Sequence, residues 1–401
     1  MNIFKKLFSS ASVQSEPGRG NAPSYSFGRP SAGINVNEST ALNLSAVFCA
    51  VRVISESLAQ LPFRVYENVN DDRIKRPDHP LDLILHTQAN SEICAYNFKE
   101  TLTSNALLFG NGYAEIERNR AGNPVALWPL NPNYTKATRD SSGKIVYEVR
   151  GGEGGNVVVM PASDVFHLKG LSFDGLVGYS PIALARESLS LSMALEQFGA
   201  SFFGNGAALS GVLETPSALS DKAYDRLKET WDAFTGTKNA HKTRILEEGL
   251  KYTQISVPPE DAQFLASRQF QVTEIARWFR VPPHKLYELS HATFSNIEHQ
   301  SKEFIDDTLS PWAERWEQEA QMKLLAPEER GRIYTKMDFK RLLRGDATAR
   351  SAYYNARFNN GSLSINEIRR LEDENGIGAD GDLRVVPMNM VSIKNAGGQN
   401  V

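Results

Sequence analysis

The sequence has few cysteines, no long apolar run and no secretion signal. Its 401 residues include two cysteines, Cys49 and Cys94, too few for a small scaffold held by disulfides. Both lie in apolar, helix-like surroundings, so we predict buried free thiols. No apolar run reaches the roughly 18 residues that span a bilayer, and the opening MNIFKKLF lacks a cleavage pattern. These absences exclude a disulfide-rich secreted module and predict no membrane partner.

An excess of positive charge is also missing. The chain has 44 Lys and Arg against 47 Asp and Glu, a net charge of -3. Proteins that hold nucleic acid tightly are usually basic, because each phosphate contact releases counterions and drives binding. The balance disfavours a nucleic-acid-binding regulator, an alternative that would require tight, salt-sensitive DNA binding by the isolated monomer.

The motifs of phosphate binding and acyl transfer are incomplete. No Gly-Lys-Ser or Gly-Lys-Thr occurs, so the chain has no Walker motif and is not itself an ATP-driven motor. Gly178, Tyr179 and Ser180 begin like a nucleophile elbow, with His167 and Asp174 nearby, but Ile182 replaces the second glycine. A hydrolase that uses Ser180 remains one alternative. In the other interpretation, Ser180 is a helix cap and we expect the chain not to be an enzyme.

Three of the seven histidines lie close together, at His284, His291 and His299. Zinc-binding pairs on helices favour a spacing of about four, which none of these has, and Pro282 and Pro283 argue against a continuous helix. We predict solvated loop histidines, no metal site and no cofactor.

The sequence does contain strong helix and strand patterns. Residues 41–61 predict a helix after the capping candidates Ser39 and Thr40, and its expected core face is Leu44, Val47, Phe48, Val51, Ile54 and Leu58. Phe63 and Val65 alternate with Arg64 and Tyr66 as in a half-buried strand. A second helix then runs from Asn90 and Ser91 to the stop at Gly110 and Gly112.

Short strands separated by turns follow this helix, as in an antiparallel meander. They are YAEIERN, VALWPL, IVYEVR and VVVM. Residues 40–170 are therefore predicted to form an α+β unit.

The second half of the chain is mainly helical. Ser180 and Pro181 open a predicted helix of about 23 residues at 1.5 Å per residue. Pro258 and Pro259 open another, and a third runs from about 296 to 325. Residues 219–234 predict a shorter helix capped by Ser220, and residues 244–255 a small hairpin.

The C-terminal region adds two predictions. Ser364 and Glu367 form a capping box. Arg341, Arg344 and Arg350 lie along one polar helical region, which we interpret as a solvated helix, with a binding surface as the alternative.

Several blocks, in this order, resemble the portal proteins of tailed bacteriophages in the branch typified by Hong Kong 97. The resemblance runs from about 42 to 390. Eight blocks in the family's order carry it, including NALLFGNGYAEIERNRAGNPVALWPLNP, DGLVGYSPIALA, EIARWFRVPPHKLY, FSNIEHQSKEFIDDTLSPW and RLLRGDATARSAYYNARFNNGSLSINEIR. Two departures affect local turns: Leu209 replaces a common proline, and Tyr287 replaces a common glycine.

The resemblance implies an α+β portal fold with an α/β wing, a helical stem, a small α/β clip and a helical crown. The implied segments are a disordered arm at 1–24, wing at 25–178 and 298–337, stem helices at 179–204 and 258–283, clip at 205–257, tunnel loop at 284–297, and crown with C-terminal tail at 338–401.

The resemblance also implies a function and partners. Portal proteins form a ring, usually of twelve subunits, at one capsid vertex of the virion, and DNA passes through its channel during packaging and ejection. The implied partners are further copies of the chain, the terminase large subunit, a head-tail adaptor, the major capsid protein, and duplex DNA without sequence specificity. Assembly would take place in the host cytoplasm.

Two sets of site residues follow from this placement. The tunnel-loop residues expected to approach DNA are Ser290, His291, Thr293, Ser295 and Asn296. In the clip, Trp231 and Phe234 are the candidate anchors for partner docking, with core burial as the equal alternative for both.

Overall fold

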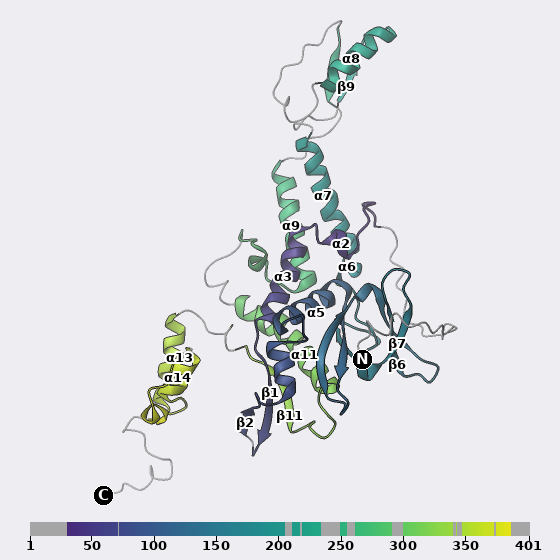
Figure 1. Cartoon of the computed structure of the whole chain (residues 1–401). Coiled ribbons are helices and arrows are strands. Elements are labelled where there is room, and N and C mark those ends of the chain that lie inside the picture. Colours follow the sequence, from purple (N-terminus) through teal and green to yellow (C-terminus); the bar gives the residue numbers. More distant parts are fainter. Residues whose placement is uncertain are drawn as a thin grey trace. The chain divides into compact units, whose positions relative to one another are not determined.

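The structure is a computed structural model that divides the chain into two compact units, residues 1–337 and 338–401. It describes residues 30–70, 72–204, 211–216, 219–233, 249–254, 261–290, 300–339, 342, 347–372 and 374–385. None of the helices in these ranges is both long and apolar enough to cross a bilayer. Each unit is described separately (Figure 1).

The first unit combines helices with short antiparallel strands. Its longer helices are α3 (Ser45–Ala59), α5 (Ala95–Phe109), α7 (Arg186–Gly204), α8 (Asp221–Ala233), α9 (Asp261–Phe279) and α11 (Ser310–Lys323). Its short helical elements are α2 (Glu38–Ala41), α4 (Pro80–Asp82), α6 (Pro181–Leu184), the π-helical turns η1 (Leu83–Thr87) and η6 (Phe304–Leu309), and the 3-10 turns η2 (Pro132–Tyr134), η3 (Ala162–Asp164) and η5 (Pro283–Leu286).

Strands make up the rest of this unit's regular structure. They are β1 (Phe63–Val69), β2 (Asp72–Lys75), β3 (Asn111–Arg118), β4 (Pro124–Leu130), β5 (Thr135–Arg139), β6 (Ile145–Arg150), β7 (Val157–Pro161), β8 (Val165–Lys169), β9 (Gly211–Glu214), β10 (Lys251–Gln254) and β11 (Ile333–Met337). Their orders are β11-β1-β2, β4-β3-β8, β5-β6-β7 and β10-β9. The predicted α+β class is confirmed.

The first predicted helix is present, with one error on its core face. Leu44, at the N-cap of α3, and the other predicted core residues of this segment are buried, but Phe48 is 52% exposed. The cap also differs, because Asn37 forms a capping box with Thr40 and starts the separate helix α2. A helical stripe defines a face only to within one side chain at its margin, and Phe48 lies at that margin.

A long-range strand pair closes the first unit. Strand β1 pairs antiparallel with β11, placing Phe63 opposite Met337 and Val65 opposite Thr335, so the early purple strand and the late green one lie side by side (Figure 1). The predicted alternation fails at Tyr66, which is buried because it stacks on Tyr334. Because the pairing joins distant segments, the residues between β2 and β11 form an excursion from this sheet.

The predicted meander is largely confirmed. Strands β5, β6 and β7 form consecutive antiparallel pairs, while β3 pairs with both β4 and the later strand β8. Helix α5 ends as predicted at Gly110, whose φ of +79° is left-handed. A Cβ on Gly178 would lie 2.0 Å from the Gly110 carbonyl oxygen, so both positions need glycine for the backbones to cross.

The core is centred on Trp316 of α11, which is fully buried. Its ring lies 5.2 Å from that of Phe166, 5.9 Å from Phe98 and 6.3 Å from Phe63, measured between ring centroids. Its indole N–H donates to Thr103 Oγ1 at 3.2 Å. One side chain thus joins α11 to α5, β1 and β8.

The two cysteines are free, as predicted, but only partly buried. Cys49 on α3 is half-buried, and burial raises the pKa of its thiol. Cys94 is exposed at the N-cap of α5. The prediction of burial is wrong for Cys94 because that residue precedes the helix and does not lie on its apolar face.

The helix predicted after Ser180 is present as two segments. Ser180 caps α6 by accepting from the Ala183 N–H, with Pro181 at the first helical position. The helical conformation breaks at Ala185 before α7 begins. Of the third predicted helix, residues 300–323 are helical, with the π-helical turn η6 inside them; residues 296–299 lie outside the described ranges.

The short sheet that lies between α7 and α9 in the sequence includes one strand from the predicted hairpin of residues 244–255. Strand β10 pairs with β9, with Tyr252 opposite Leu213; the proposed first arm, residues 244–248, lies outside the described residues. Helix α8 begins after Ser220, whose hydroxyl accepts from the Ala223 N–H as predicted.

The second unit contains α13 (Ala347–Asn359), α14 (Ile365–Leu371) and the 3-10 turn η7 (Ala379–Asp382). Ser364 and Glu367 form the predicted capping box. Asn366 is buried and holds the following loop, because its amide donates to the Gly378 carbonyl and its oxygen accepts from the Ile377 N–H. Of the three arginines in the predicted polar helical region, Arg350 places its Nε 3.6 Å from Glu372 Oε1. Arg341 and Arg344 lie outside the described residues.

Candidate functional site

The hydrolase alternative places Ser180, His167 and Asp174 together, and the structure does not. Ser180 Oγ donates to the Leu108 carbonyl at 2.6 Å and caps α6. Asp174 Oδ1 accepts from the Leu176 N–H within its own turn. Each side chain therefore has a local structural role, and the Ser180 hydroxyl bonds to the Leu108 carbonyl and, at 3.4 Å, to Glu38 Oε1, not to His167 or Asp174.

His167 is buried in a saturated hydrogen-bond network. The Asn111 amide nitrogen donates to the Gly178 carbonyl, so the Asn111 oxygen accepts from the Gly178 N–H and from His167 Nε2 at 2.9 Å. His167 Nδ1 then accepts from the Tyr147 hydroxyl at 3.0 Å. Burial, with smaller effects of Lys169 and Lys323, holds the pKa of His167 well below its usual value. The imidazole stays neutral and structural.

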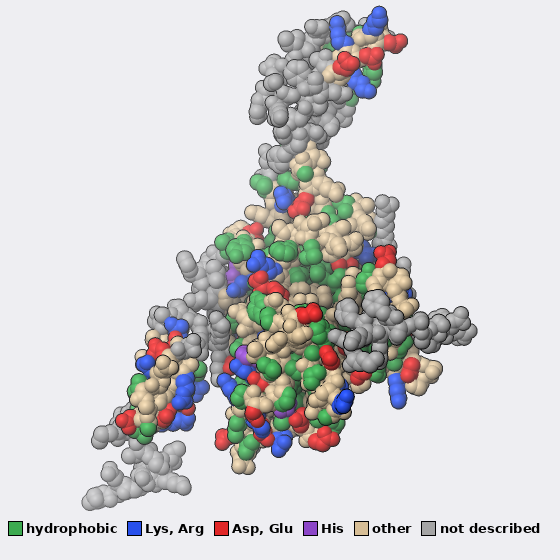
Figure 2. All heavy atoms as spheres, viewed as in Figure 1, with side chains coloured by type: hydrophobic (Ala, Val, Ile, Leu, Met, Phe, Trp, Pro, Cys, Tyr) green, Lys and Arg blue, Asp and Glu red, His purple; other side chains and the backbone are tan. Residues whose placement is uncertain are grey.

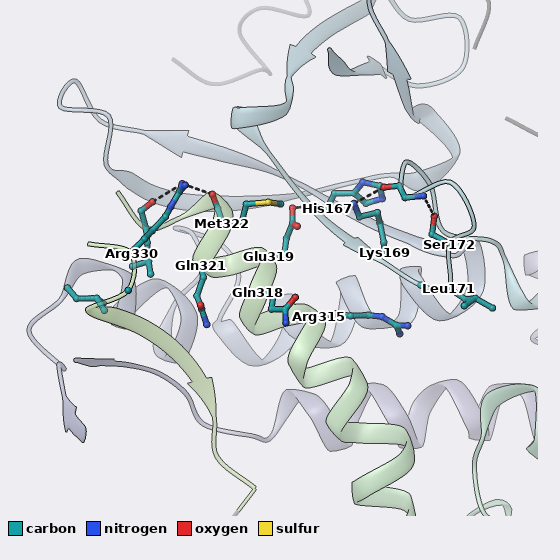
Figure 3. Close-up of a pocket in the computed structure, with 15 residues that line it drawn as sticks. His167, Lys169, Leu171, Ser172, Arg315, Gln318, Glu319, Gln321, Met322 and Arg330 are labelled. Atoms are coloured by element: carbon teal, nitrogen blue, oxygen red, sulfur yellow. Dashed lines mark hydrogen bonds between the residues drawn. The ribbon is translucent and has the colours of Figure 1, made fainter. Parts of the chain in front are cut away.

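A hollow of about 770 Å³ lies beside this histidine (Figure 3). Glu319 points from α11 toward β8, and its Oε1 accepts from the His167 N–H at 3.1 Å. Burial raises the pKa of Glu319, despite that hydrogen bond and the charges of Lys323 and Lys169. Arg315, Lys169 and Ser172 also line the hollow, and the Ser172 hydroxyl donates to Asp174 Oδ1 at 3.1 Å within the same turn.

The metal alternative also lacks structural support. Among the described residues, no group of three or more His, Cys, Asp or Glu side chains is placed to hold a metal ion. His284 Nδ1 lies 2.7 Å from Gln300 Oε1, which occupies one of its two ring nitrogens. His291 and His299 lie outside the described residues.

The remaining candidate is an antiparallel helix pair, α7 and α9, with the segment that follows it. The Ser192 hydroxyl donates to Gln271 Oε1 at 2.9 Å. Glu196 Oε1 lies 3.6 Å from Arg268 Nη2. A Cβ on Gly199 would lie 2.9 Å from the Phe264 ring, so glycine permits the close helix approach there.

Contacts to η6 fix the end of α9. Arg280 adopts a left-handed φ of +56°, and its carbonyl accepts from Thr308 Oγ1 at 2.5 Å. The chain then enters η5, and the His284–Gln300 contact joins the two sides of the undescribed stretch 291–299. The base of this stretch is thereby attached to both α9 and the helix leading to α11.

Of the five predicted tunnel-loop residues, only Ser290 lies within the described ranges. Ser290 is exposed, and its N–H donates to Glu288 Oε1 at 3.0 Å. Both residues line a hollow of about 430 Å³ with Phe270 of α9. His291, Thr293, Ser295 and Asn296 lie outside the described residues, as does Phe234; for Trp231 only the backbone, in α8, is described.

Tyr287, which stands where the resembled family commonly has glycine, is in the left-handed conformation, with φ +62°. It is 85% exposed, so few contacts offset a backbone cost of roughly 1–2 kcal/mol. We expect Tyr287→Gly to raise the free energy of unfolding by about 1 kcal/mol, measured by denaturant titration. Tyr287→Ala is the control: equal stabilisation by alanine would show that the left-handed backbone is not the cause.

Comparisons with known proteins agree with this architecture. The family described as "Phage portal protein" matches residues 45–373. The chain belongs to the phage portal protein family. It is 34% identical to the portal protein of Enterobacteria phage HK97 over 84% of this chain and 80% of that protein. It is 33% identical to the probable portal protein of Streptomyces phage phiC31, over 87% of this chain and 79% of that protein. The resemblance inferred from the sequence blocks is confirmed.

Two solved structures share the fold. The crystal structure of an HK97 family phage portal protein from Corynebacterium diphtheriae matches with a TM-score of 0.57 and 15% identity, over 78% of this chain and 99% of that one. A chain from the neck of a native gene transfer agent particle, computed with C12 symmetry, matches with a TM-score of 0.56 and 23% sequence identity. The match covers 84% of this chain and 93% of that one. The predicted portal fold is therefore confirmed.

Proposed function

We propose that this portal protein assembles into a ring of twelve subunits at one capsid vertex and that duplex DNA passes through the ring during packaging and ejection. The observation that carries the proposal is the pairing of helices α7 and α9 in a chain that matches the phage portal protein family. A related fold forms part of a particle neck computed with C12 symmetry, which supports the subunit number.

The proposed roles follow the segments. The wing comprises residues 25–178 and 298–337, supported by the pairing of β1 with β11 across these parts. Residues 179–204 and 258–283 are the stem, around α7 and α9, and 205–257 are the clip. Residues 284–297 are the tunnel loop, and 338–401 are the crown and tail, with a separate compact unit beginning at residue 338.

A DNA channel must avoid strong, lasting contacts. Each phosphate held by a lysine or arginine would add affinity and slow passage. Between Glu288 and Glu298 the sequence has no lysine or arginine. This composition supports a tunnel loop that contacts DNA through weak polar groups, including Ser290, His291 and Asn296.

The proposed partners lie at different segments. The clip would face the terminase large subunit during packaging and the head-tail adaptor afterwards, with Trp231 and Phe234 as contacts. The wing would contact the major capsid protein. Because the chain has no Walker motif, a separate ATPase supplies the work of packaging, and the portal contributes no catalysis. The protein would act in the virion after assembly in the host cytoplasm.

Imaging the purified protein tests the ring. Negative-stain micrographs and native mass measurement are expected to show a ring of twelve subunits with a central hole wide enough for duplex DNA. A monomer or dimer under every solution condition would contradict the proposal. Tight, salt-sensitive DNA binding by the monomer would instead favour the regulator alternative.

Lysine substitutions test the tunnel loop. We expect the pair of changes His291→Lys and Asn296→Lys to slow packaging and alter DNA retention, because each adds a phosphate contact. An in vitro packaging assay measures the rate, with Lys285→Arg as a control that keeps the charge. Unchanged packaging and retention in rings of normal appearance would count against placing this loop at the DNA.

A further inference from the structure

The hollow beside His167 has a local excess of positive charge. Lys169 from β8, Arg315 from α11 and Arg330 from the loop before β11 all line it (Figure 3). Among the described residues that line it, the one carboxylate is Glu319. On the face of the first unit seen in Figure 2, acidic and basic side chains are interspersed, and the chain as a whole has a net charge of -3. The hollow is therefore a local exception to an acidic chain.

Arg315 is the least compensated of these charges. Its guanidinium is half-buried and lies over the Trp312 ring, 4.8 Å from the ring centroid. In the part of the chain that the structure describes, no carboxylate or carbonyl oxygen accepts a hydrogen bond from it. Burial, and secondly the charge of Arg280, lower the pKa of Arg315. A half-buried guanidinium with only an aromatic neighbour keeps its N–H donors available for a ligand.

The other two cations are held in place by backbone carbonyl groups. Lys169 Nζ donates to the Gly175 carbonyl at 3.1 Å. Arg330 Nη2 donates to the Met322 carbonyl at 2.8 Å and to the Leu325 carbonyl at 3.4 Å. These contacts position both charges along the hollow without neutralising them.

The single carboxylate does not balance the three cations. Glu319 Oε1 accepts from the His167 N–H at 3.1 Å. Burial raises the pKa of Glu319, which favours its neutral form. The hollow therefore keeps an excess of positive charge in either protonation state of this residue.

Exposed apolar side chains and the spacing of the arginines define the rest of the site. Leu171 is 57% exposed and Met322 is 51% exposed, and both line the hollow. Arg315 and Met322 are seven residues apart on α11, about 10 Å at 1.5 Å per residue. Arg330 is bound at the Met322 end. Two guanidinium groups separated in this way, beside apolar side chains, fit an elongated ligand.

We propose that the hollow binds an extended acidic segment of a protein partner, with one carboxylate on Arg315, a second on Arg330 and an apolar side chain against Leu171 and Met322. In the polyproline II conformation, side chains three residues apart project from the same side of the chain and lie about 9 Å apart. That spacing matches the two arginines. Arginine suits this role because its planar guanidinium can bind a carboxylate through two N–H groups. The proposal goes beyond ring formation and DNA passage and does not depend on either.

The site favours a peptide over DNA. Proteins that bind a phosphate backbone present rows of exposed Lys and Arg side chains. Here the central cation, Arg315, is half-buried, and the exposed residues beside it include Leu171 and Met322. An apolar side chain next to a carboxylate complements both features, whereas a sugar-phosphate chain complements only the charge.

Fluorescence anisotropy with the full-length protein tests the site. The probe is the C-terminally amidated tetrapeptide Glu-Pro-Leu-Glu carrying an N-terminal rhodamine, and Gln-Pro-Leu-Gln is its uncharged control. We expect saturable binding of the acidic peptide and a roughly tenfold loss of affinity in Arg315→Gln, because a charge-assisted hydrogen bond is removed from a half-buried site. Arg120→Gln removes an exposed arginine that does not line the hollow and should leave the affinity unchanged.

A double-mutant cycle assigns each carboxylate to its arginine. Gln-Pro-Leu-Glu and Glu-Pro-Leu-Gln each lack one carboxylate. One of these peptides should bind wild type more weakly than Glu-Pro-Leu-Glu does, yet bind Arg315→Gln as well as Glu-Pro-Leu-Glu binds that variant. The other peptide should show the same relation to Arg330→Gln.

The remaining outcomes contradict the proposal. Equal affinity for the acidic and the uncharged peptide, or no saturable binding of either, would show that the hollow is not an acidic-peptide site. Equal weakening by Arg315→Gln and Arg120→Gln would show that binding follows overall charge. A short DNA duplex that displaces the peptide from wild type, and that itself binds Arg315→Gln more weakly, would assign the hollow to nucleic acid. Circular dichroism of Arg315→Gln should match wild type; if this variant misfolds, Lys169→Gln replaces it in the anisotropy test.

Discussion

Trp316→Ala is expected to lower the free energy of unfolding by about 3–5 kcal/mol, the range for truncating a large buried aromatic residue. Trp316 is fully buried among Phe63, Phe98 and Phe166. Its loss would leave a cavity where α11 meets β1, α5 and β8, and would also leave the Thr103 hydroxyl without its indole donor. Denaturant unfolding of the unassembled protein measures the change.

An exposed aromatic residue supplies the control. Phe173 is 66% exposed, so Phe173→Ala should change the unfolding free energy by no more than about 0.5 kcal/mol. Trp316→Phe should fall between the two, because it retains most of the apolar volume. A loss below about 1 kcal/mol for Trp316→Ala would show that the core does not depend on this side chain.

Lys99→Met is expected to stabilise the protein by about 2 kcal/mol at pH 7. Lys99 is buried on α5, and its Nζ donates to the Leu61 carbonyl at 2.6 Å. Burial lowers the pKa of its amine to about 8, a shift of roughly two and a half pKa units worth about 3 kcal/mol. Methionine removes this cost but loses one hydrogen bond, worth about 1 kcal/mol.

The pH dependence has a definite sign. Between pH 8 and the ordinary lysine pKa of about 10.4, the unfolded chain keeps the proton that the folded amine releases. Stability from this group therefore rises with pH, by about 1 kcal/mol from pH 7 to 9. Below the pKa of about 8 that Lys99 has in the folded protein, the destabilisation by its buried charge is fully present.

Comparing wild type with Lys99→Met at pH 7 and pH 9 isolates this effect, because other groups titrate equally in both proteins. The difference in unfolding free energy should shrink at pH 9. Lys99→Arg is the matched variant that keeps the charge and should be less stable than wild type. A difference that does not change with pH would contradict a lowered pKa for Lys99.

Local signals in the sequence predicted four of the element ends correctly, but not the start of α5, which is capped at Cys94 and not at Asn90 or Ser91. Ser180, Ser220, Ser364 and Gly110 occupy the capping positions that their residue types favour. Such signals act within one turn of chain, so no distant contact is needed to read them.

One error came from a distant contact. Tyr66 is buried by Tyr334, which lies far along the chain, and alternation within one strand cannot report a partner in another. Strand β10 also pairs with β9, which lies outside the predicted hairpin of residues 244–255. A pairing choice depends on tertiary structure as well as on strand propensity.

The candidate site was harder to predict than the fold. The family resemblance placed the tunnel loop, but most of its residues and the side chains of Trp231 and Phe234 lie outside the described part of the chain.

The pairing of β1 with β11 also affects synthesis of the chain. Val65 meets Thr335, so the first strand leaves the ribosome long before its partner exists. At 5–20 residues per second, the wait is on the order of tens of seconds. During that time one edge of β1 is open to other strands. We therefore expect newly made chains to depend on chaperones until the last residues of the first unit emerge.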